Sequence, residues 1–165
     1  MEDAAGAAGV LGWLEASSLS LAMRGNLWLY PAVEIVHIVG FVVLVGAVAM
    51  FDMRLLGWSK SLPVQQLGQH LLPWSLASLA LVVPAGLMMF SAHPHDFVSN
   101  SAFLLKLGLI AAAGVNALVF HAGAYRSVES WNTATSPPRS AKLHAVLSLL
   151  IWVAVICCGR LLAYT

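Results

Sequence analysis

Four long apolar runs divide the chain and alternate with short polar segments. The runs span about 29–51, 71–90, 103–121 and 145–164, and each is close to the roughly 20 residues that a helix needs to cross the hydrocarbon core of a bilayer. The pattern predicts an all-α integral membrane protein. We expect its four transmembrane helices to form one four-helix bundle over residues 28–165, with the lipid bilayer as its surroundings.

The segment before the first run, residues 1–27, predicts a short helix that lies in the membrane surface. It starts with acidic side chains, and its first apolar stretch is short and lacks preceding basic residues, so it does not have the pattern of a signal peptide. Leucine and tryptophan side chains then alternate with Glu15 and several serines, which is typical of an interfacial helix. We expect the helix to end at residues 24–26.

The composition excludes two classes of protein. Hydrophobic residues make up 60% of the 165 residues and charged residues 9%, which excludes an ordinary soluble domain. A net charge of +1 gives no basic surface for phosphates, so we expect no nucleic-acid partner. Cys157 and Cys158 are neighbours on a predicted helix and point about 100° apart, which disfavours a disulfide. No CxxCH motif occurs, which excludes covalently attached c-type haem.

Basic residues predict the orientation of the helices. The loops 52–70 and 122–144 lie on the same side and hold five of the eight lysines and arginines. By the positive-inside rule these loops are cytoplasmic and both termini lie on the outer side. Lys106 is early in the third run, where we expect its side chain to extend outward to the membrane surface.

Two ionisable side chains lie inside the first apolar run. Glu34 and His37 are three residues apart and therefore share one helix face. Charged groups at membrane depth are costly and usually mark a cofactor, an ion path or a proton relay. The alternative is a neutral His37 that hydrogen-bonds a neighbouring helix and only serves packing, with Glu34 near the headgroups.

Threading the helices alternately through the membrane sorts the histidines into two levels. His70, His121 and His144 fall near the cytoplasmic surface. His37 falls in the outer half, and His93 and His95 fall in a polar outer loop at 91–96. Histidines that project inward from facing helices at one depth are what a b-type haem needs.

The favoured interpretation of the cytoplasmic level is a haem b site. His70 and His121 are the favoured axial pair, and His144 is the reserve ligand. Gly68 and Gly123 would leave room for the macrocycle, and Arg126 or Lys142 would meet the propionates. One haem is expected at this level.

A second, outer site stays open. His37, with Glu34 as a proton acceptor or an orienting partner, would hold a second haem, although the sequence offers no clear partner ligand. Copper is the alternative cofactor: a metal path would lead from His93 and His95 through Glu34 and His37 to the methionines, and the three cytoplasmic histidines would also suit copper or zinc.

Several segments resemble a family of small, largely uncharacterised bacterial four-helix inner-membrane proteins. These segments are WLYPAVEIVHIVG, FDMRLLG, HLLPWSLASLALVVPAGLMMF, LKLGLI…NALVFH and IWVAVICCGRLLAY. The resemblance implies a bacterial inner-membrane location, with both termini periplasmic. More remotely, the chain is similar to the HemJ-type protoporphyrinogen oxidases, which are haem b proteins, and to the CopD-type copper-resistance proteins. The HemJ-type likeness implies roles for His37, Arg54 and Lys106.

Four functions follow from these observations. The leading one is a b-type haem protein that passes electrons between a quinone or a redox partner and an acceptor outside the membrane. A copper-binding or copper-transporting protein, a HemJ-like porphyrinogen oxidase and a structural subunit are the alternatives, so enzyme activity as a haem-dependent oxidoreductase stays open. Small-residue patches at Gly46-Ala47 and 111–114 allow close helix approach, which is compatible with a homo-oligomer.

Overall fold

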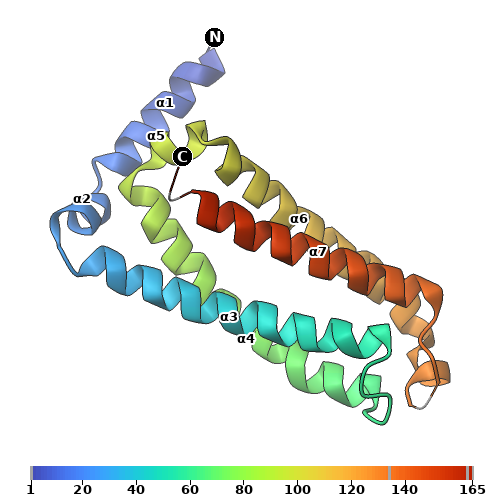
Figure 1. The fold of residues 1–165 in the computed structure, drawn as a ribbon. Helices are drawn as coiled ribbons and strands as arrows, with labels where there is room; N and C mark the ends of the chain where they lie inside the picture. The colour runs from blue at the N-terminus through green and yellow to red at the C-terminus, as the bar shows by residue number, and fades with distance from the viewer. Residues whose placement is uncertain (1, 134, 163, 165) are drawn as a thin grey trace.

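The computed structural model describes residues 2–133, 135–162 and 164, with side chains from Gly9 onward, and this part of the chain is helical without any strand. In chain order the helices are α1 (Glu2–Glu15), α2 (Ser18–Gly25), α3 (Leu29–Leu56), α4 (Val64–Ala92), α5 (Pro94–Ser99), α6 (Ser101–Ala122), the 3-10 helix η1 (Ala124–Trp131) and α7 (Arg139–Leu161). Figure 1 shows them in these labels.

The four predicted membrane spans are confirmed as helices. α3, α4, α6 and α7 are each long and apolar enough to cross a bilayer. Their outward surfaces carry large apolar side chains, including Leu76, Leu118 and Leu143, which are 68%, 72% and 68% exposed. Such surfaces need an apolar environment, because burying a leucine side chain away from water is worth about 1.5–3 kcal/mol. The protein is therefore a multi-pass membrane protein.

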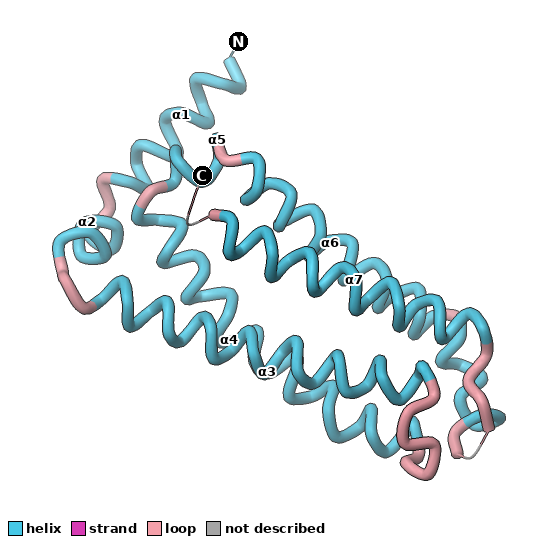
Figure 2. Tube along the Cα trace, in the orientation of Figure 1, coloured by secondary structure: helices cyan, strands magenta, loops and turns pink. Residues whose placement is uncertain are grey.

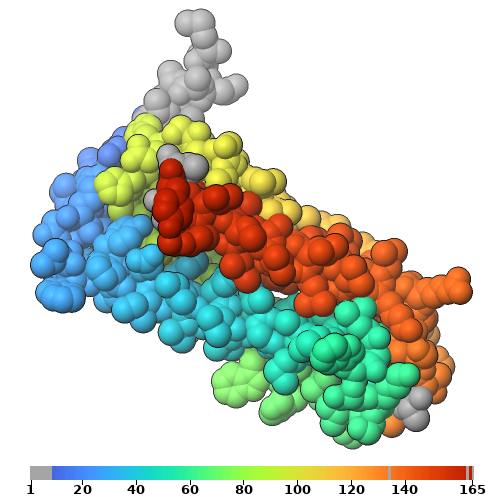
Figure 3. All heavy atoms as spheres, viewed as in Figure 1, coloured from blue at the N-terminus to red at the C-terminus, as the bar shows by residue number. Residues whose placement is uncertain are grey.

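The four spans pack in the order α4–α3–α7–α6. α3 packs along α4 and also contacts α7, and α6 packs along α7. In the described chain the backbone of α4 does not approach α6 or α7, but the Phe90 ring of α4 stacks on the Phe103 ring of α6 at a centroid distance of 5.7 Å. Figures 1 and 2 show the resulting two pairs, α3 with α4 and α6 with α7. Figure 3 shows atoms of α3 directly beside those of α7 on the face in view. The α3–α7 contact thus joins the two halves of the bundle.

Gly40 lets α3 and α4 approach closely. A Cβ atom at Gly40 would lie 2.9 Å from Val82 Cγ2, 3.0 Å from Leu81 Cβ and 3.3 Å from the Ser78 carbonyl oxygen. Two of these three neighbours are fixed to the α4 backbone and cannot rotate away. The α3–α4 crossing therefore depends on the missing side chain.

Replacing Gly40 with valine is expected to lower the free energy of unfolding by about 1–3 kcal/mol, because the added carbons force the two helices apart. Gly46→Val on the same helix is the matched control, since a Cβ there meets nothing within 4 Å. Thermal unfolding in detergent, followed by circular dichroism, measures both variants. Equal melting temperatures for the two variants would contradict this account of the crossing.

Arg54 fastens the loop that joins α3 to α4. Its side chain is only 2% exposed, and its guanidinium donates to the carbonyl oxygens of Leu62 at 2.7 Å, Lys60 at 3.3 Å and Asn132 at 3.1 Å. α3 ends immediately before this loop at Gly57, whose φ of 106° is in the left-handed region that favours glycine. The α3–α4 loop is thereby fixed to the end of η1.

The N-terminal segment forms two helices rather than one. α1 and α2 are separated at residues 16–17, where Ser17 caps α2 by accepting a hydrogen bond from Ser20 N at 3.2 Å. Arg24, in the last turn of α2, donates to the Ala92 carbonyl at 2.8 Å and to Glu15 Oε1 at 3.2 Å. This places α1 and α2 against the end of α4 (Figure 3). The predicted end near residues 24–26 is confirmed, whereas interfacial placement stays a prediction.

Two predicted loops contain helix. The outer segment 91–96 was expected to be a polar loop, yet Pro94 opens the short helix α5, because proline is suited to the first helical turn. The loop 122–144 also contains helix, because η1 lies within it and packs Val128 and Trp131 into the core. Both segments close an end of the bundle.

Candidate functional site around His37

His37 lies two turns into α3 and reaches across to α4. Its Nδ1 atom is 2.9 Å from the carbonyl oxygen of Val82. The ring is half-buried, and by a rise of 1.5 Å per residue it lies about 12 Å from the start of α3. His37 is thus a polar group held at membrane depth by a bond to the neighbouring helix.

The Val82 bond determines which ring nitrogen is free. A carbonyl oxygen can only accept a hydrogen bond, so Nδ1 of His37 must carry the proton and donate it. In the neutral imidazole Nε2 is then unprotonated and has a lone pair for a ligand. Histidines that bind metals usually hold their other nitrogen in this way, because the second bond fixes the ring and its tautomer.

Gly86 and the Phe41 ring lie beside the imidazole, and Trp152 packs against Phe41. A Cβ at Gly86 would lie 3.1 Å from His37 Cε1 and 3.4 Å from Nδ1, so the ring needs the missing side chain. Phe41, one turn further along α3, is stacked with the His37 ring at a centroid distance of 6.5 Å. Trp152 of α7 meets Phe41 edge-on at 5.8 Å. These contacts connect the His37 site to α7.

Lys106 packs against α7, and its predicted extension toward the membrane surface stays a prediction. Its Nζ lies 3.7 Å from the position of a Cβ on Gly159 of α7, where the glycine leaves room for the lysine chain. Its ammonium also interacts electrostatically with His37. The two residues that the HemJ-type resemblance singled out within the membrane are therefore near each other in the bundle. Glu34, one turn before His37, is exposed, although it too interacts with His37 electrostatically.

His70 and His121, the favoured axial pair, are exposed side chains. His70 lies two residues beyond Gly68, which faces Phe51 and Tyr125, so a turn of about 200° directs His70 away from that contact. His121 uses Nδ1 to bond the Ala117 carbonyl of its own helix at 2.8 Å. Within the described chain the two rings make no contact with each other. Their joint ligation of a haem stays a prediction.

His144 is bound to α6 through Asn116. The Asn116 amide nitrogen donates to the His144 carbonyl at 3.0 Å, and the Asn116 Oδ1 atom is 2.7 Å from His144 Nδ1. The first bond orients the amide, so His144 Nδ1 is the donor in the second. Both residues line a mostly apolar groove of about 520 Å³ between α6 and α7.

The groups expected to accommodate a haem at this level have other neighbours. A Cβ on Gly68 would lie 3.2 Å from Phe51 Cε2 and 3.4 Å from the Tyr125 hydroxyl, so protein fills the space beside it. Lys142 donates to Ser136 Oγ at 3.0 Å. Arg126 is exposed. The haem expected at this level stays a prediction.

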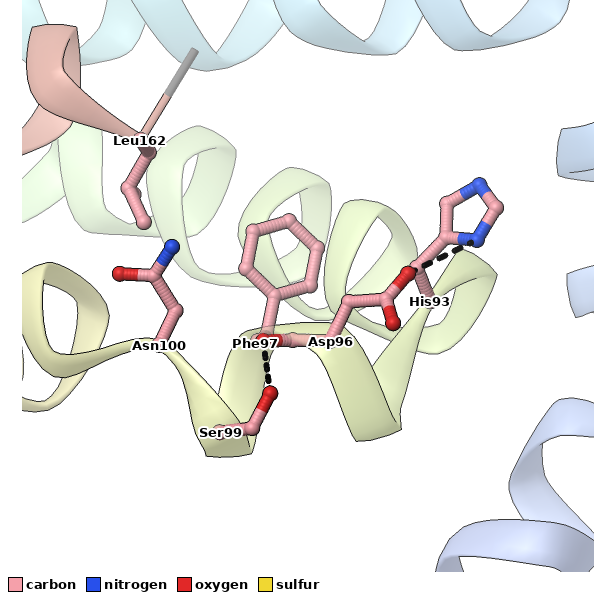
Figure 4. Close-up of a pocket in the computed structure, with 6 residues that line it drawn as sticks. All are labelled: His93, Asp96, Phe97, Ser99, Asn100 and Leu162. Atoms are coloured by element: carbon pink, nitrogen blue, oxygen red, sulfur yellow. Dashed lines mark hydrogen bonds and ion pairs between the residues drawn. The ribbon is translucent and has the colours of Figure 1, made fainter. Parts of the chain in front are cut away.

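The outer histidines belong to two separate contacts. His93 Nδ1 lies 3.7 Å from Asp96 Oδ2, beside a surface pocket that Figure 4 shows. His95 Nε2 instead lies 3.7 Å from Glu15 Oε2 of α1. Among the described residues, no three histidine, cysteine or carboxylate side chains gather as a metal site. The copper path through His93 and His95 stays a prediction.

Sequence reasoning singled out His37 but missed its partners. The Val82 carbonyl has no signal in the sequence, since every residue has a backbone carbonyl. Gly86 and Trp152 carry a weak signal, because a glycine and a large aromatic within apolar spans often mark close contacts. The contacts become visible only when α3, α4 and α7 are placed together.

One protein family matches most of the chain. The family of unknown function DUF6644 matches residues 10–165. No curated protein and no solved structure is similar enough to match. Nothing in these comparisons links the chain to the HemJ-type or CopD-type proteins.

Proposed function

The chain belongs to DUF6644, a family of unknown function, and from the geometry around His37 we propose that it binds a b-type haem and transfers electrons within the membrane. The observation that carries this proposal is the hydrogen bond of 2.9 Å between His37 Nδ1 and the Val82 carbonyl. It leaves Nε2 as a fixed, unprotonated nitrogen in the bundle, which is the donor that a haem iron takes from a protein.

The residues around His37 would supply such a cofactor with a ligand, a cation and apolar neighbours. His37 would be the axial ligand, and the Val82 carbonyl would hold its ring. Lys106 is the cation that would meet a propionate, since its ammonium interacts with His37 and lies against Gly159. Phe41 and Trp152 add an apolar wall that excludes water. A bound haem would supply one-electron transfer, with a potential set by this ligand and its surroundings.

The membrane location supports an electron-transfer role with a lipid-soluble partner. Four spanning helices would keep the cofactor inside the bilayer, where a quinone diffuses. A redox protein at the membrane surface is the other class of partner. A reduction assay with a soluble quinol would identify the electron donor and the electron acceptor.

Replacing Gly86 with alanine is expected to weaken haem binding about 10–100-fold, the range for losing a group that orients a metal ligand. The new Cβ would lie 3.1 Å from His37 Cε1 and displace the ring from the Val82 carbonyl. Gly108→Ala on α6 is the control, because a Cβ there meets nothing within 4 Å and the gain in helix propensity is the same. Haemin titration of both proteins gives the affinities; equal values would contradict the role of Gly86.

A HemJ-like porphyrinogen oxidase is the second candidate function. The interaction between His37 and Lys106 favours it, because these are the residues to which the HemJ-type resemblance gives roles. This candidate also needs haem, so colour alone does not separate it from an electron carrier. Turnover of protoporphyrinogen by the purified protein, lost in Lys106→Ala, would establish the oxidase; a haem-loaded protein without turnover would leave electron transfer.

A further inference from the structure

Asp52 is a buried carboxyl group at the far end of α3 from His37. It is 5% exposed, and its Oδ2 atom is buried with no hydrogen-bond partner in the described chain. The hydroxyl group of Ser148 on α7 is a polar neighbour of the carboxyl. Fifteen residues, or about 22 Å of helix, separate Asp52 from His37. The carboxyl therefore lies outside the proposed haem site.

The charged groups near Asp52 do not pair with it. Arg54, two residues further on, donates from Nε and Nη2 to three loop carbonyls, and its buried Nη1 atom has no partner in the described chain. On α7, His144 lies one turn before Ser148 and holds Asn116 with Nδ1. On α4, the titratable residue at this end is His70, which is exposed. No described cation is within ion-pair distance of the Asp52 carboxyl.

An ionised carboxylate in this position would be expensive. Removing a charge from water without a partner costs several kcal/mol even after the protein relaxes, and an unpaired buried oxygen adds a further penalty. A protonated carboxyl is neutral and therefore avoids the cost of removing a charge from water. It also gains an O–H group that can donate to a neighbouring oxygen.

We propose that Asp52 and Ser148 form a proton-binding site in the interior of the bundle. The Asp52 carboxyl holds one proton, and the Ser148 hydroxyl, which can both donate and accept, is its exchange partner. A proton is favoured over a metal cation, because hard cations need several oxygen ligands and among the described residues no cluster of three histidine, cysteine or carboxylate side chains includes Asp52. Ser148 and His144 are four residues apart on one face of α7, which gives the proton a polar route toward α6.

Infrared spectroscopy of the full-length protein in detergent tests this site. A protonated carboxyl has a carbonyl stretching band that is separate from the carboxylate bands. We expect this band in the wild type at neutral pH, its loss in the isosteric variant Asp52→Asn, and its persistence in Glu34→Gln, which changes an exposed carboxyl. Ser148→Ala is expected to shift the band by removing its hydrogen-bond partner, which gives a second readout if Asp52→Asn does not fold.

Three results would overturn the proposal. One is a wild-type spectrum without the band at neutral pH, and another is a band that persists unchanged in Asp52→Asn. The third is a band that disappears when sodium replaces potassium in the buffer, because that would identify a cation site. A band that is insensitive to this exchange and falls as the pH is raised would support reversible proton binding.

Discussion

Replacing His37 with alanine is expected to remove haem from the protein completely. His37 is the histidine whose free nitrogen lies at membrane depth with the ring fixed by a neighbouring helix, and no other residue at this site provides an imidazole. The measurement is the Soret absorbance per protein after purification with added haem. His70→Ala and His121→Ala, which change exposed side chains, are expected to keep the wild-type spectrum.

Imidazole rescue separates loss of the ligand from loss of the fold. His37→Gly would leave a space beside Gly86, and added imidazole would restore the absorption band if the nitrogen alone was missing. Loss of haem in His70→Ala and His121→Ala, with a normal spectrum for His37→Ala, would place the haem at the other end of the bundle. That result would restore the axial pair expected from the sequence and contradict the His37 assignment.

Replacing Arg54 with alanine is expected to lower the free energy of unfolding by about 3–5 kcal/mol. Three carbonyl oxygens, those of Lys60, Leu62 and Asn132, lose a charged donor in a buried place. A hydrogen bond to a charged group contributes about 1.5–3 kcal/mol net of exchange with water, and removal of the buried, unpartnered Nη1 atom of Arg54 offsets part of the sum. Arg54→Lys is expected to recover only part of the loss, since an ammonium cannot reproduce the planar fork of a guanidinium.

Chemical unfolding in detergent, followed by tryptophan fluorescence, gives the free energies for these variants. Arg126→Ala is the matched control, because Arg126 is an exposed arginine in the neighbouring η1 segment; surface changes usually stay within about 0.5 kcal/mol. An Arg54→Ala protein as stable as Arg126→Ala would show that the loop does not depend on this residue.

The membrane spans were predictable because a run of about twenty apolar residues is typical of a transmembrane helix. Their ends were less predictable. α4 begins at Val64 and α7 at Arg139, several residues before the apolar runs. Polar residues next to an apolar run readily extend the helix that the run forms. The helix at Pro94 had a readable signal, in that proline at the first position and Asp96 in the first turn both favour a helix start.

The site was less predictable than the spans. Glu34 and His37 stood out as ionisable residues in an apolar run, but the Val82 carbonyl and the direction of Lys106 depend on how the helices cross. A lysine near a membrane surface extends outward by default, and the sequence does not show that the space at Gly159 of α7 lies beside the end of Lys106. The histidines at the other end shared a depth, yet a common depth does not fix which way side chains point around a helix.

The visible spectrum of the detergent-purified wild-type protein, oxidised and then reduced with dithionite, tests the central proposal most directly. We predict a Soret band that shifts on reduction and a haem content near one per chain, both absent from His37→Ala. A folded, colourless protein that takes up no added haem would contradict the proposal.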